Sequence, residues 1–94
     1  MSGHAVTITA SYDASHAQPG TADRIRDWVD RDDGRTFVID TSIAPVRWTV
    51  TADYWIDAPD AQAAEIAAVT LFGIDTSTAL IDPPETVLAA TGPL

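Results

Sequence analysis

The chain has 94 residues, and its 14 acidic residues outnumber five arginines to give a formal net charge of −9. It contains no cysteine, which excludes disulfides, thiolate nucleophiles and cysteine-based zinc sites. It also contains no lysine, so direct binding of nucleic acid or of an anionic membrane is disfavoured, because both depend on basic side chains.

The length and hydropathy of the chain indicate one folded unit. Residues 1–94 suit a single domain, and 46% of them are hydrophobic, as in ordinary folded proteins. No apolar run approaches the roughly 18 residues of a membrane span. The first residues show no basic segment followed by an apolar stretch, so we expect a cytoplasmic protein.

The first half of the chain predicts a strand, a helix and a second strand. Residues 6–13 alternate between apolar and polar side chains, which is typical of a half-buried strand. An apolar stripe predicts a helix over 22–33, with Thr21 as its N-cap and Gly34 ending it in the left-handed conformation. Residues 36–39 form a short β-prone run.

The second half begins with the most regular pattern of the sequence. From Val46 to Ile56 every even position is apolar, which predicts the longest strand. A second helix is expected to open at residues 57–59, to run over 61–72 and to end at Gly73. Residues 79–81 are expected to be extended, 86–90 to form the last strand, and the tail from 91 to fray.

This order of elements predicts an α+β fold with the ferredoxin-like arrangement β-α-β-β-α-β. We expect a four-stranded antiparallel sheet with two helices on one face, the first and third strands being central. The prolines at 83 and 84 place the last strand at an edge. The helices should cover the face of Val46 and Val50 and leave a threonine-rich face open. The fold hosts many activities, so it does not by itself indicate a function.

Two groups of acidic residues on or near the first helix are candidate sites. The run 30–34 resembles a calcium loop, but the spacing of its glycine and acids does not fit. Asp23, Asp27 and Asp30 form a stripe that could imitate a row of phosphates. The competing interpretation is a solvated helix face whose acids pair with neighbouring arginines, Asp27 with Arg24 and Arg31, and Asp30 with Arg26.

No residues point firmly to catalysis. A set of His4, His16 and Asp13 could bind a metal or act as a base. His4 lies four residues from the chain end and His16 in a predicted loop, however, so nothing supplies a firm third ligand. The sequence also lacks a nucleophile motif and a phosphate-binding glycine loop. We therefore expect no enzyme activity, no cofactor and no metal site.

Trp55 is the strongest candidate for an interaction residue. It falls on the polar side of the longest strand, where a tryptophan is unexpected, and tryptophan is common in interface hot spots. The alternative is a bulge that turns it under a loop. Asp53 and Arg47 share its face, and Val69 and Phe72 of the second helix complete the candidate set.

These observations favour a non-catalytic protein–protein interaction domain, either self-associating as a homo-oligomer or docking on a protein partner. The alternative is an acidic inhibitor or nucleic-acid mimic that acts on a basic partner, as small proteins of mobile elements and phages often do. A third interpretation, an enzyme or small-molecule sensor using the open sheet, is permitted only by the fold.

Overall fold

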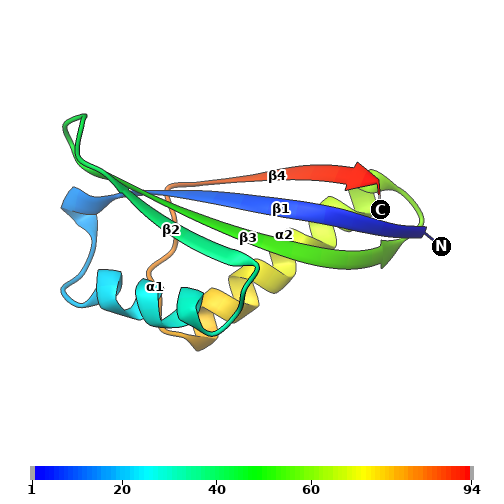
Figure 1. Ribbon diagram of the computed structural model, residues 1–94, viewed down its shortest axis with the longest axis horizontal. Helices are drawn as coiled ribbons and strands as arrows, with labels where there is room; N and C mark the ends of the chain where they lie inside the picture. Colours follow the sequence, from blue (N-terminus) through cyan, green and yellow to red (C-terminus); the bar gives the residue numbers. More distant parts are fainter. Residues whose placement is uncertain (1, 94) are drawn as a thin grey trace.

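A computed structural model describes residues 2–93 and shows one antiparallel sheet with two helices on the same side of it (Figure 1). In chain order the elements are β1 (Ser2–Asp13), the short 3-10 helix η1 (Ala14–His16), α1 (Thr21–Asp30), β2 (Arg35–Asp40), β3 (Arg47–Ala58), α2 (Ala61–Thr78) and β4 (Thr86–Pro93). The strand order is β2-β3-β1-β4. The predicted ferredoxin-like arrangement is confirmed, with β1 and β3 central and β4 at an edge.

The two central strands carry the core. β1 and β3 pair from Ser2 opposite Ala58 to Asp13 opposite Arg47, so their even-numbered residues share the face that the helices cover. That face and the helices bury one apolar cluster. Its largest fully buried side chains are those of Val6, Ile8, Ile25, Val50 and Phe72.

Helix α1 begins and ends differently from the prediction. Gly20, with a φ of 87°, is the N-cap, and Thr21 is the first helical residue. The Thr21 hydroxyl donates to Asp82 instead of capping its own helix, and the residue is fully buried. Arg31 is the C-cap, and Gly34 has no left-handed backbone. The predicted helix therefore began one residue too late and ended three residues too late.

Helix α2 is longer than predicted because its buried stripe continues past the glycine. Ala64, Ala68, Phe72 and Thr76 are buried at a spacing of four residues. Gly73 lies inside the helix, where a glycine costs about 1 kcal/mol of helix propensity. Burial of Phe72 and Thr76 in the stripe offsets this cost. The helix starts at its N-cap Asp60, whose carboxylate accepts from the Ala63 amide.

The predictions at the ends of two strands were also wrong. Residues 79–81 form a turn instead of a strand, with Leu80 at a φ of 59°. Strand β4 continues to Pro93, because β1 begins early enough to pair with it along its whole length. In the part of the chain that the structure describes, no helix combines the length and apolar character needed to cross a bilayer.

Candidate functional site

The face of the sheet turned away from the helices is open and rich in hydroxyl groups. Its residues are the odd-numbered ones of β1 and β3 and the even-numbered ones of β2 and β4, which stand opposite one another in the strand register. The hydroxyl-bearing members are Thr7, Thr9, Ser11, Thr36, Thr49, Thr51 and Thr86. These short side chains cover the middle of the face, which also carries charged residues and a few larger apolar ones.

Trp55 stands on this open face, as its phase in the sequence predicted. Its side chain is 72% exposed. Ala5 lies directly opposite it on β1, and Gly92 lies opposite Ala5 on β4. Strand β2 pairs with β3 only as far as Ala52, so it does not flank the indole. The small neighbours leave the ring uncovered, and no bulge turns it inward.

The immediate surroundings of Trp55 are acidic. Asp53 and Asp57 are exposed, and they flank Trp55 along the same face of β3. The Thr7 hydroxyl donates to the Asp53 carboxylate at 2.8 Å, and the Asp53 amide donates to the Gly34 carbonyl at 2.9 Å. Asp53 is therefore held in place by two neighbouring segments.

The arginines lie elsewhere and are engaged in other contacts. The two exposed ion pairs on α1 join Arg26 to Asp23 and Arg31 to Asp27. Arg35 lies 3.9 Å from the ring centre of Trp28 and donates to the Trp28 carbonyl. Arg24 donates to the Leu80 carbonyl and to the Thr21 hydroxyl. Arg47 forms an ion pair with the Glu85 carboxylate. Among the described residues, therefore, no arginine side chain forms an ion pair with Asp53 or Asp57.

Arg47 shares the open face with Trp55 but lies at the other end of it. It stands opposite Asp13 and Asp40 and forms an ion pair of 2.7 Å with Glu85. Eight residues of strand separate it from Trp55, or about 27 Å. The structure thus brings Trp55 and Asp53 together but leaves Arg47 out of their site.

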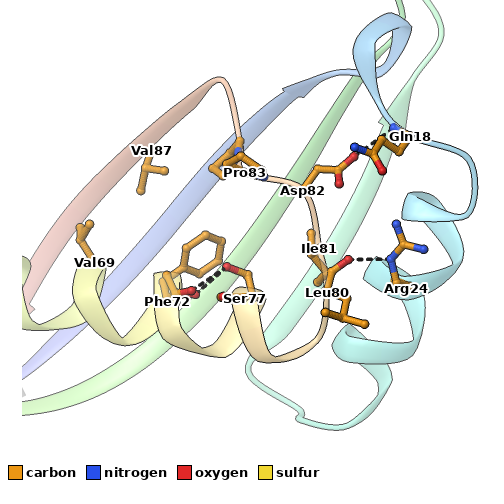
Figure 2. Close-up of a pocket in the computed structure, with 13 residues that line it drawn as sticks. Gln18, Arg24, Val69, Phe72, Ser77, Leu80, Ile81, Asp82, Pro83 and Val87 are labelled. Atoms are coloured by element: carbon orange, nitrogen blue, oxygen red, sulfur yellow. Dashed lines mark hydrogen bonds between the residues drawn. The ribbon is translucent and has the colours of Figure 1, made fainter.

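The two candidate residues on α2 have different surroundings. Phe72 is only 2% exposed and packs edge-on against Trp28, with ring centres 5.8 Å apart, so it belongs to the core. Val69 is 39% exposed and faces Val87 of β4 across a groove (Figure 2). Two adjoining hollows of about 720 and 400 Å³ form this groove, and both are lined by Val69 and Val87.

The acidic stripe on α1 is largely neutralised within the helix. Arg31 donates to Asp27 at 2.6 Å, as expected, whereas Arg26 pairs with Asp23 at 3.6 Å instead of with Asp30. Arg24 leaves the stripe altogether. It donates to the Leu80 carbonyl at 2.6 Å, because the turn after α2 brings that oxygen beside α1 (Figure 2). The stripe does not present three free carboxylates.

The histidines do not meet. His16 lies 3.5 Å from Asp13 beside a hollow of about 310 Å³, while His4 is on the core side of β1 opposite Ile56. The same hollow is lined by Tyr12, whose pKa is raised to about 12 by burial and by the nearby Asp82 carboxylate. Among residues 2–93, no three histidine, aspartate or glutamate side chains gather as metal ligands.

Some surface features were not predicted from the sequence. Leu88 and Val38 are exposed on the open face, at 67% and 58%, because each stands opposite a threonine in the register. Asp57 was predicted to open a helix, but it lies on β3 beside Trp55.

Neither family models, nor curated proteins, nor solved structures match this chain.

Proposed function

We propose that this protein is a non-catalytic interaction domain that docks on a protein with a cationic surface, with Trp55 as its anchor. The observation that carries the proposal is the 72% exposure of a tryptophan between two exposed aspartates on a central strand. Tryptophan side chains of this kind dominate the binding energy of many interfaces.

The apolar part of the argument concerns the indole. Covering a large aromatic side chain is favourable by about 25 cal/mol per Å² of apolar area removed from water. Ala5 and Gly92 are too small to cover Trp55 within the chain, and they leave room for a partner on either side. Strand pairing with β1 holds the Trp55 backbone, so little conformational entropy is lost on docking.

The charged part concerns the kind of partner. Asp53 and Asp57 add negative potential at the anchor, and the whole chain has a net charge of −9. Opposite charge on a partner accelerates association and selects against acidic competitors. The partner is therefore expected to present arginine or lysine around an apolar pocket that fits an indole.

The test compares capture of lysate proteins by the immobilised wild-type chain and by Trp55→Ala. A protein retained by the wild type is identified and purified, and its affinity is then measured at low and high salt. We expect a basic protein whose affinity falls at least about tenfold with Trp55→Ala, which is 1.4 kcal/mol, and falls again with added salt.

Ile74→Ala is the matched control. Ile74 is 56% exposed on α2, on the other side of the molecule from the open sheet face, so its truncation removes exposed apolar area without touching the anchor. Capture that is unaffected by Trp55→Ala, or that Ile74→Ala reduces equally, would contradict the proposal.

A further inference from the structure

Strand β4 leaves one side of its backbone without a strand partner. Within residues 2–93, β4 is paired with β1 alone. The Ala14 amide donates to the Val46 carbonyl, and this pair continues the register of β1 with β3. In an antiparallel ladder the backbone groups of alternate residues point to the same neighbour, so those of the even-numbered residues of β1 bond to β3 and those of the odd-numbered residues bond to β4. By the register with β1, the backbone groups of Val87, Ala89 and Thr91 point to the free edge of β4.

This edge lacks the usual protection against pairing. Natural proteins protect sheet edges with charged side chains, bulges or very short strands. The six-residue β2 at the opposite edge has Arg35 and Asp40 at its ends. β4, in contrast, has eight residues and no charged side chain, and its only proline is the last residue.

The groove beside β4 continues the apolar surface onto α2. Val69 and Val87 line it on opposite sides (Figure 2), and Ile66, Thr70 and Ala89 extend it along the helix and strand. Ile66 is 62% exposed. An extended strand added to the free edge would place alternate side chains against this helix, as in other complexes formed by strand addition.

We propose that the occupant is a second copy of this chain, whose β4 pairs antiparallel with β4 about a two-fold axis at Ala89. This pairing places Val87 opposite Thr91 of the second copy and Leu88 opposite its Ala90. The exposed Leu88 thus meets a small residue, and the alanines at the axis leave space for Ile66 and Val69 of both helices. A two-fold interface of this kind must be self-complementary.

The charge distribution favours a second copy at this edge. Two chains of charge −9 repel, so they approach best where the surface carries least charge. Among the described residues, Glu65 is the one carboxylate that lines the smaller hollow, beside Leu88 and Ala89, and the Thr91 hydroxyl donates to it at 2.9 Å. The larger hollow has Asp82 at its end near α1, where the backbone amide of Gln18 and the Thr21 hydroxyl donate to that carboxylate. In the antiparallel pairing the two Thr91 residues lie four residues apart along the seam, or about 14 Å. This distance exceeds the Debye length of about 8 Å at physiological salt, so repulsion between the two Glu65 carboxylates bonded to these threonines is screened.

The experiment is sedimentation velocity over a range of concentrations for the wild type, Ile66→Glu and Ile74→Glu. Both substitutions add one carboxylate to an exposed position of α2, but only Ile66 lines the groove. We expect a reversible wild-type dimer whose dissociation constant rises about tenfold or more with Ile66→Glu, because that carboxylate would be desolvated. Ile74→Glu should change it by less than about twofold.

Amide hydrogen exchange supplies a second readout at the backbone. The amides of Val87, Ala89 and Thr91 should gain protection at concentrations where the dimer forms. A monomer at every concentration would overturn the proposal, and so would a dimer in which these amides exchange as in the monomer. A dimer abolished by Trp55→Ala but not by Ile66→Glu would also overturn it, and would leave docking of a cationic protein to its own test.

Discussion

Trp55 on β3 and Ala5 on β1 stand directly opposite each other on the open face of the sheet. In most antiparallel pairs a large residue is partly covered by its cross-strand neighbour, which stabilises the sheet. Here the alanine offers a single methyl group, and the tryptophan is 72% exposed. The pair therefore contributes little to the fold and leaves the indole available.

The first prediction is that Trp55→Ala leaves stability almost unchanged. Since most of the side chain is already in water, its truncation should alter the free energy of unfolding by less than about 1 kcal/mol. Urea denaturation followed by circular dichroism measures this change. A loss comparable to that of a core truncation would mean that the indole is covered in solution.

The second prediction concerns Phe72, which should behave in the opposite way. Its ring is buried and packs against Trp28, so Phe72→Ala should lower the free energy of unfolding by about 3–5 kcal/mol through lost burial and a cavity. Phe72→Leu, which keeps most of the volume, should cost clearly less. Equal effects of the two substitutions in the same denaturation experiment would contradict a tightly packed Phe72.

The contrast between these two aromatic residues shows what the sequence could predict. The phase of Trp55 was readable because strict alternation along β3 assigns each residue to one face. The face of Phe72 was not readable, because α2 is apolar nearly all round and has no polar side to define its orientation. Its burial depends on the sheet and on Trp28, which sequence periodicity does not report.

The same limit explains the errors at the ends of elements. Gly73 is typical of a helix end, yet burial of Phe72 before it and of Thr76 after it carries α2 through the glycine. Arg24 has Asp27 at helical spacing, but it bonds to a carbonyl supplied by a turn more than fifty residues later. Local patterns predicted which elements form and in what order, whereas contacts distant in sequence decided where they end.

The third prediction concerns Asp82, which joins the turn after α2 to the start of α1. Its carboxylate accepts from the backbone amide of Gln18 at 3.0 Å and from the Thr21 hydroxyl at 2.9 Å. These two hydrogen bonds, and the positive charge of Arg24, lower the pKa of Asp82. Asp82→Ala should destabilise the protein by about 1–3 kcal/mol at neutral pH.

The pH dependence of this effect follows from the direction of the shift. A lowered pKa in the folded state means that the ionised carboxylate contributes stability above the ordinary pKa of about 3.8 and loses it as the pH falls through the folded value. The stability gap between wild type and Asp82→Ala should therefore narrow below about pH 4. A gap that is constant down to strongly acidic pH would contradict the role of the charge.

The fourth prediction concerns Tyr12, whose hydroxyl is buried without a hydrogen-bond partner among the described residues. Burial first, and then Asp82, raise its pKa from 10.0 to about 12. The unfolded chain thus loses this proton at lower pH than the folded chain does, so stability falls as the pH rises between these values. Tyr12→Phe should weaken this alkaline loss and change stability at neutral pH by no more than about 1 kcal/mol.

Tyr54 provides the comparison. Its pKa is also raised, by burial and by its hydrogen bond to Asp75. Because that hydroxyl has a partner, Tyr54→Phe should destabilise the protein at neutral pH, by about 1 kcal/mol or more. Denaturation at several alkaline pH values distinguishes the two variants. A similar neutral-pH loss for both would mean that Tyr12 also has a partner in solution.

The most direct test of the proposed function is the affinity of a purified basic partner for the wild type and for Trp55→Ala, measured by calorimetry on variants shown to be equally stable. We predict that Trp55→Ala weakens binding by at least about tenfold, and that added salt weakens the binding of both proteins. Equal affinities for the two proteins would contradict the central claim that Trp55 anchors the docking surface.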